Sequence, residues 1–338
     1  MTPAFGLNRL DLGSVANFAA SAQLAESLGW QYGFIPSSPL LVRDPYVMLA
    51  AAALQTRTLR LGPLIENPVM RHPATIAGSI ATVEELAPSR TVLGLGIGDT
   101  AVRLMAEKPA TVRALGESID TIHALLRGTP VNVDAQRAPR LAHRRDVPIW
   151  VAAQGPRTLE TAGRVADGVF IRVGTHPRNI GTAIEHVQAG AEAAGRDAVD
   201  VAIGLIFHTV ISDDPSKVAL IKRSMAAGYA EYSPSLLATA GLVWDSRDLA
   251  ELQGEVWPDF HHASDLAAAG ELVSDLNEAT ADAFCVSGSW SAVRDQFHDL
   301  TARWPAAQVI IPHPVSVGGR AAPAEYMTAF AREVIAHT

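Results

Sequence analysis

The most restrictive feature of this 338-residue sequence is a regular alternation of short apolar segments with helical ones. Strands are predicted at 4–7, 32–35, 59–65, 92–97, 147–153, 168–173, 201–211 and 308–311, and a helical pattern follows nearly every one. Eight strands joined by helical crossovers are all parallel, and the natural closure of such a sheet is an α/β fold of the (β/α)8 TIM-barrel class. A doubly wound open sheet is the structural alternative.

One region breaks this alternation. Between 231 and 282, prolines and glycines such as Pro234, Gly241 and Pro258 punctuate short helical pieces. We interpret 231–282 as an insertion after the seventh strand, within a single domain that covers 1–338.

Composition limits the partners. The formal net charge of −8 gives no electrostatic basis for binding nucleic acid or an anionic membrane, so small molecules are the expected partners. Cys285 is the single cysteine, which excludes an internal disulfide and favours a buried structural thiol. The N-terminus lacks the pattern of a signal peptide, and no apolar segment is long enough to span a bilayer, so a cytoplasmic protein is expected.

The stretch 90–99 suggests a close approach by a ligand. Its apolar run passes into Gly94, Gly96 and Gly98 and ends at Asp99. Glycines at alternate positions would let one backbone edge lie against a flat ring, although a tight strand-to-helix turn explains the same residues. The spacing matches neither a P-loop nor a dinucleotide-binding loop.

In a barrel, chemistry is expected in the loops that follow the strands. Two of these loops, Gln154-Gly155-Pro156 and Val173-Gly174-Thr175, precede helices whose free amides and dipole suit a phosphate. Together they predict an anion cradle.

Four sequence blocks, taken in order, carry a resemblance to a known family. They are RDPYVMLA at 43–50, LGPLIENP at 61–68 with RHP at 71–73, GLGIGD at 94–99, and AAQGP at 152–156 followed by ADGV at 166–169. The chain resembles the luciferase-like monooxygenase superfamily, and within it the F420-dependent oxidoreductases related to methylenetetrahydromethanopterin reductase.

The resemblance implies a flavin-type ring that lies across the strand ends. In the family the third strand often ends in a non-prolyl cis peptide behind the ring; the matching residues are Leu64 and Ile65, and Leu64 replaces a frequent glycine, which leaves the cis bond open. The implied ring and phosphate contacts are Leu64, Ile65, Glu66, Asn67, Gly96, Ile97, Gly98, Asp99, Gln154, Gly155, Gly174 and Thr175.

Two departures from the family pattern affect the expected proton donor. Relatives commonly carry an acidic residue where this chain has Asn8, and an Asp after strand two where it has Ser37 and Ser38. Hydride transfer does not depend on these acids, because the cofactor carries that chemistry. The substrate of methylenetetrahydromethanopterin reductase is therefore not assigned to this chain.

The candidate catalytic residues are Glu66 and His72. Glu66 is a candidate acid or ring contact, against a solvated loop carboxylate, and His72 a candidate general acid, against a structural role before Pro73. Three further alternatives stay open. Arg172 is a candidate counter-charge for phosphate, and His176 and His313 lie in strand-end loops. The pair His261-His262 lacks the companions of a metal site, and no metal is expected.

The leading hypothesis is an oxidoreductase that uses reduced F420, or alternatively FMN, to transfer hydride to, or oxygenate, a small organic substrate. The alternative is a related barrel that binds flavin or another ligand without turnover. The nearly all-apolar helix at 46–54 predicts a homodimer through this helix and the next one. A separate cofactor reductase remains an open partner.

Overall fold

The computed structural model describes residues 3–8, 10–98, 100–131, 139–252, 254–318 and 323–338. The chain divides into two compact units. Unit 1 comprises Met1–Pro3, Ile171–Glu185 and Leu205–Thr338, and unit 2 comprises Ala4–Phe170 and His186–Gly204. The whole of the predicted insertion, 231–282, lies in unit 1. The single domain over 1–338 stays a prediction.

Unit 2 holds the first six strands, which are β1 (Ala4–Leu7), β2 (Tyr32–Ile35), β3 (Arg60–Pro63), β4 (Leu93–Leu95), β5 (Ile149–Ala153) and most of β6 (Gly168–Ile171). β1 pairs with β2, β2 with β3 and β4 with β5, always in parallel. Two isolated parallel bridges, Leu61 to Thr91 and Glu66 to Leu95, join β3 to the β4 segment. The predicted strands 59–65 and 92–97 are thus shorter in the structure, and their ends form the bridges.

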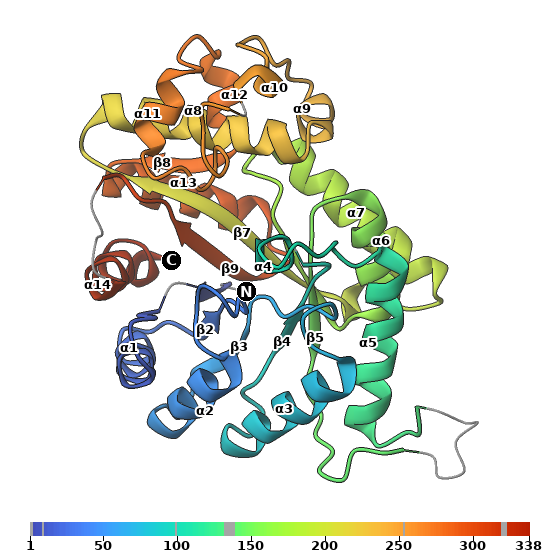
Figure 1. The fold of residues 1–338 in the computed structure, drawn as a ribbon. Helices are drawn as coiled ribbons and strands as arrows, with labels where there is room; N and C mark the ends of the chain where they lie inside the picture. Colours follow the sequence, from blue (N-terminus) through green and yellow to red (C-terminus); the bar gives the residue numbers. More distant parts are fainter. Residues whose placement is uncertain (1–2, 9, 99, 132–138, 253, 319–322) are drawn as a thin grey trace. The chain divides into compact units, whose positions relative to one another are not determined.

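The helices of unit 2 follow the strands in the predicted order, and the longer ones pack side by side (Figure 1). They are α1 (Val15–Ser27), α2 (Pro45–Gln55), α3 (Pro73–Leu86), α4 (Thr100–Arg103), α5 (Val112–Arg127) and α6 (Pro156–Val165), followed by α7 (Pro177–Ala193), which begins in unit 1, and the short η1 (Ala198–Asp200). Polar side chains cap two of the helix starts: Ser14 accepts the Asn17 amide at 3.0 Å, and Asp44 accepts the Tyr46 amide at 2.9 Å.

Backbone crowding explains part of the glycine pattern. A Cβ on Gly94 would collide with the Pro63 carbonyl, so this glycine lets the chain of β4 pass close to that of β3. A Cβ on Gly96 would likewise collide with Ile65. At these two positions the glycines serve packing within the protein.

Unit 1 is built around β7 (Ala202–Ile211), β8 (Cys285–Gly288) and β9 (Ala307–Pro314). β7 pairs with β8 in parallel, and the Val315 amide donates to the Thr209 carbonyl at 2.9 Å. The helices are α8 (Pro215–Tyr232), α9 (Ser235–Ala240), α10 (Leu249–Leu252), α11 (Leu266–Glu271), α12 (Glu278–Asp282), α13 (Trp290–Arg303) and α14 (Pro323–Glu333), with η2 (Ile335–His337) at the end. Helices α9, α11 and α12 and strand β8 all pack against α8 (Figure 1).

The eight strands predicted from the sequence are all present. The described residues also form a ninth, β8, only four residues long, which pairs with β7 outside the main strand order directly after the insertion. A run this short cannot be told from the end of a helix by periodicity. Cys285 lies in β8 and is buried, and burial raises the pKa of its thiol to about 12, as befits a structural cysteine. No helix in the described part of the chain is long and apolar enough to cross a membrane.

Candidate functional site

The carboxyl ends of β3 and β4 are joined by backbone contacts that fix Glu66. The Glu66 amide donates to the Gly94 carbonyl at 2.9 Å, and the Gly96 amide donates to the Glu66 carbonyl at 3.0 Å. The peptide bond between Leu64 and Ile65, immediately before Glu66, is cis. This is the position at which the family resemblance implied such a bond.

The Glu66 side chain is fully buried, not solvated. Its Oε1 accepts hydrogen bonds from the Ser37 hydroxyl and the Asn67 amide, both at 3.0 Å, and Arg71 Nε lies 3.2 Å from Oε2. Burial raises the pKa of Glu66 above its ordinary value, while these donors and Arg71 oppose the shift. Glu66 is therefore a carboxyl group that exchanges its proton closer to neutrality than an exposed glutamate does.

Arg71 connects Glu66 to a second acid. Its Nη2 lies 2.7 Å from Asp44 Oδ2, and its guanidinium carbon lies 5.1 Å from the centre of the Tyr46 ring. Burial and the nearby Glu66 carboxylate raise the pKa of the Tyr46 hydroxyl well above its usual range. We call Ser37, Tyr46, Glu66 and Arg71 the Glu66 cluster.

The two serines after β2 have different surroundings. Ser37, at a position where relatives of the resembled family carry an acid, donates to Glu66 from the end of the next strand. The hydroxyl of Ser38 is buried and makes no hydrogen bond with any residue that the structure describes. The carboxyl group of Glu66, which follows β3, thus lies beside the end of β2. Matching this chain to the family residue by residue could not indicate this contact.

The remaining predicted residues of this region have largely structural contacts. Asn67 Oδ1 accepts the amides of Val69 and Met70 at 3.2 and 2.9 Å. His72 is exposed, and its Nδ1 accepts the Ala74 amide at 3.1 Å as the N-cap of α3, so only Nε2 is open to chemistry. Gly98 packs against Asn67, and Asp99 lies outside the described residues.

The loop after β5 leaves room for an anion. Gln154 follows the strand, and Gly155 is the N-cap of α6 without a side-chain capping bond. A Cβ added at Gly155 would meet no heavy atom within 4 Å. An uncapped helix start beside open space is the arrangement that accepts a phosphate.

The corresponding loop in unit 1 is more occupied. Gly174 packs against the backbone of Ala283 and Phe284. The amide of Thr175 donates to the Ala283 carbonyl at 2.9 Å, and its hydroxyl donates to the Asp282 carbonyl at 3.1 Å. His176 accepts the Arg178 amide at the start of α7. The polar groups of Thr175 are therefore already satisfied within the protein.

The sequence analysis missed a group of aromatic side chains around His208 of β7. The His208 ring lies 5.0 Å from His261, 5.3 Å from His313 and 5.6 Å from Tyr229, measured between ring centroids. Among the described residues, no group of histidines, cysteines and acids has the arrangement of a metal site. The available signal was a single histidine in an otherwise apolar strand. We call His208, His261, His313 and Tyr229 the histidine cluster.

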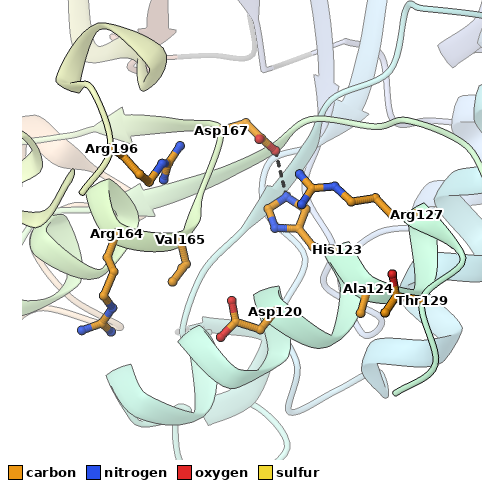
Figure 2. A pocket seen from close by; sticks show the side chains of 9 residues that line it. All are labelled: Asp120, His123, Ala124, Arg127, Thr129, Arg164, Val165, Asp167 and Arg196. Carbon is orange, nitrogen blue, oxygen red and sulfur yellow. Dashed lines mark hydrogen bonds and ion pairs between the residues drawn. The ribbon is translucent and has the colours of Figure 1, made fainter. Parts of the chain in front are cut away.

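Unit 2 also contains a polar pocket of about 450 Å³ at the amino-terminal end of β6 (Figure 2). In it, His123 Nε2 and Asp167 Oδ2 lie 2.9 Å apart, and Asp167 also accepts the Ile149 amide at 2.8 Å. Arg196 donates to the Gly163 carbonyl in the last turn of α6 at 2.8 Å. These contacts join helices to the amino-terminal ends of strands. In a barrel, residues at that end of the strands contribute to stability.

A family model for luciferase-like monooxygenases matches residues 2–307. The chain belongs to this family. It is 30% identical over 306 residues to the 5,10-methylenetetrahydromethanopterin reductase of Methanolobus tindarius, which covers 88% of this chain and 90% of that protein.

Two solved structures have the same fold. The coenzyme F420 dependent tetrahydromethanopterin reductase from Methanopyrus kandleri aligns with a TM-score of 0.80 and 25% identity, over 100% of this chain and 99% of that one. An F420-dependent secondary alcohol dehydrogenase aligns with a TM-score of 0.70 at 15% identity, over 99% and 98%. The fold is thus a nearly closed parallel (β/α)8 barrel, as predicted, and this member of the family is an oxidoreductase.

Proposed function

We propose that this luciferase-like oxidoreductase uses reduced F420, with FMN as the alternative cofactor, to transfer hydride to, or oxygenate, a small organic substrate. The observation that carries the proposal is the similarity, over nearly the whole chain, to reductases whose names specify F420 or methylenetetrahydromethanopterin. The choice of F420 over FMN rests on those reductases. The substrate is left open, because the residues after β1 and β2 depart from the family pattern.

The described residues fit such a cofactor. The open space beside Gly155, at an uncapped helix start, suits a phosphate. In unit 2, Leu64, Ile65, Asn67, Gly96, Ile97 and Gly98 would lie along the ring, and Gln154 and Gly155 would hold the phosphate. In unit 1, the polar groups of Thr175 are already hydrogen-bonded, and the phosphate role of Gly174 and Thr175 stays a prediction from the resemblance. When bound, the cofactor supplies the hydride.

The protein's own contribution would be a proton. Glu66 is a fully buried carboxyl group with a raised pKa, and its Oε1 is held by Ser37 and the Asn67 amide. Oε2 makes no hydrogen bond with a described residue and lies 3.2 Å from Arg71 Nε, so it is the atom that can hold or release a proton. We infer that Glu66 acts as the general acid or base and that His72 caps α3.

These two roles are separable by kinetics. With any substrate that turns over, Glu66→Gln is expected to lower turnover by about 10²-fold and to leave cofactor affinity unchanged. His72→Asn, which removes the exposed imidazole but keeps a side-chain acceptor at the N-cap of α3, should leave turnover nearly unchanged. The reverse pattern would assign the proton to His72.

The cofactor assignment is tested by titrating the purified protein with F420 and, separately, with FMN, following fluorescence quenching. Gly155→Asp places a carboxylate in the space proposed for phosphate and should abolish binding. Gly254→Asp adds the same side chain at another glycine with no atom within 4 Å, and it is the matched control. Binding of FMN alone would favour oxygen-dependent chemistry. Binding of neither cofactor would contradict the proposal.

We also infer a homodimer through α2 and α3. Val47 and Leu54 of α2 are 56% and 69% exposed, and Leu86 of α3 is 38% exposed, which is a costly apolar surface for a monomer. Light scattering of the wild type and of Leu54→Asp should show a dimer and a monomer, respectively. A monomeric wild type would contradict this.

A cytoplasmic location, suggested by the free Cys285 thiol, and regeneration of F420 by a separate reductase complete the proposal.

A further inference from the structure

Arg71, in the loop after β3, is shared between two carboxyl groups. Its Nη2 lies 2.7 Å from Asp44 Oδ2, and its Nε lies 3.2 Å from Glu66 Oε2. The Glu66 side chain is fully buried, whereas 41% of the Asp44 side chain is exposed. The shorter contact is thus made with the more exposed acid. A single guanidinium cannot neutralise both carboxylates, and Glu66 has the weaker share of its charge.

Asp44 is held in place by the start of α2. It is the N-cap residue of this helix, and its Oδ1 accepts the backbone amides of Tyr46 at 2.9 Å and Val47 at 3.2 Å. Oδ2 is left for Arg71. Burial alone would raise the pKa of Asp44, but the hydrogen bond from Arg71 and those from the two amides outweigh it and keep the pKa below its ordinary value. Asp44 is therefore ionised throughout the range in which Glu66 exchanges its proton.

The other described residues that hydrogen-bond to Glu66 carry no charge. Ser37 and the Asn67 amide donate to its Oε1, and the contacts from β4 are backbone hydrogen bonds. Tyr46, whose ring centre lies 5.1 Å from the guanidinium carbon of Arg71, keeps its proton because burial and the Glu66 carboxylate raise its pKa. The share of the Arg71 charge that reaches Glu66 therefore determines whether this carboxyl group is ionised.

We propose that Asp44 is a positioning residue for proton transfer by Glu66: it holds Arg71 through Nη2 and draws the guanidinium charge away from Oε2, so that Glu66 can carry a proton. Without the charge of Asp44, Arg71 would be free to pair with Glu66 through two parallel N–H groups, the geometry that guanidinium and carboxylate favour, and Glu66 would stay ionised. The N-cap of α2 thus acts on the buried acid through Arg71. This inference rests on the proposed role of Glu66 as the proton donor or acceptor.

The test is the titration of Glu66 in the full chain without cofactor, followed through the ¹³C resonance of its Cδ. Asp44→Asn removes the charge and keeps an oxygen that can cap α2, so the midpoint of Glu66 should fall by about 1 pH unit. Asp44→Ser, which also keeps a capping oxygen, should give the same shift. Asp214→Asn is the matched control: Asp214 caps α8 through the amides of Ser216 and Lys217, also before a proline, and its replacement should leave the midpoint unchanged.

Turnover provides a second measurement. With any substrate that turns over, the limb of the pH profile that depends on Glu66 should move to lower pH in Asp44→Asn by the same amount, with cofactor affinity unchanged.

A Glu66 midpoint that stays constant in Asp44→Asn, or that rises, would overturn the inference; a rise would mean that Asp44 keeps Arg71 within reach of Glu66. If Glu66→Gln leaves turnover unchanged, the proposed function of Glu66 fails, whereas the midpoint shift in Asp44→Asn can still be measured.

Discussion

The Glu66 cluster and the histidine cluster both bury titratable groups, but they differ in how the cost of a buried charge is avoided. Glu66 is fully buried and keeps a guanidinium 3.2 Å away together with two hydrogen-bond donors. His208 is buried and His261 is partly buried, neither has a carboxylate partner for its ring, and both avoid the cost of a buried charge by remaining neutral. Burial disfavours the charged form in both places.

The difference shows in the direction of the pKa shifts. Burial moves the carboxyl pKa of Glu66 upward from its ordinary value and moves the imidazole pKa values of His208 and His261 downward from theirs. The shift at Glu66 favours holding a proton, whereas the shifts at the histidine cluster favour neutral rings. The predictions that follow test this contrast.

The largest expected effect comes from removing the counter-charge of Glu66. Arg71→Gln should lower the free energy of unfolding by about 3 kcal/mol at pH 8, because it leaves a buried carboxylate unpaired. The loss should shrink at pH 5, where the carboxyl group can protonate instead. Denaturant unfolding at the two pH values measures it, with the exposed pair member Arg113→Gln as the control. An equal loss at both pH values would contradict the ion-pair account.

A double variant sharpens this result. In Glu66→Gln/Arg71→Gln no buried charge remains, so the loss at pH 8 should be about 2 kcal/mol smaller than the sum of the two single variants. Denaturant unfolding of the wild type, the two single variants and the double variant gives the full double-mutant cycle. Additive losses would mean that Arg71 acts only through Asp44.

The histidine cluster predicts acid sensitivity. The unfolded chain takes up a proton at an ordinary histidine near pH 6.5, whereas His261 in the folded chain does so only near pH 3. The contribution of neutral His261 to the free energy of unfolding is therefore fully present above about pH 6.5. It decreases by about 1.4 kcal/mol per pH unit as the pH falls towards 3. His261→Gln should reduce the slope by one proton, and the exposed His298→Gln should not. An unchanged slope in His261→Gln would contradict the neutral state.

The smallest effect is expected at Ser37. Ser37→Ala removes one hydrogen bond to the buried Glu66 carboxylate, which should cost about 1 kcal/mol at pH 8 and raise the pKa of Glu66 further. Unfolding at pH 8 and at pH 5 separates the loss of the hydrogen bond from the change in the pKa of Glu66. A larger loss at pH 5 than at pH 8 would show that Ser37 supports the protonated form.

Most of the fold follows from local patterns, whereas the contacts within the site do not. The spacing of apolar residues located the helices, and caps such as Ser14 and Asp44 are equally local, because capping depends on neighbours in sequence. The Ser37 to Glu66 bond and the contact of His208 with His261 join residues 29 and 53 positions apart, and no pattern within one segment encodes them. The strand β8 was missed because four residues carry too little periodicity.

The most direct test of the account is the pKa of the Glu66 carboxyl group. It can be followed in protein labelled with ¹³C at the glutamate Cδ, with Glu66→Gln identifying the resonance. The account predicts a midpoint above the ordinary value of 4.5, and a still higher one in Arg71→Gln. A midpoint at or below 4.5 would mean that Glu66 is a permanently ionised partner of Arg71 and not the proton donor of this oxidoreductase.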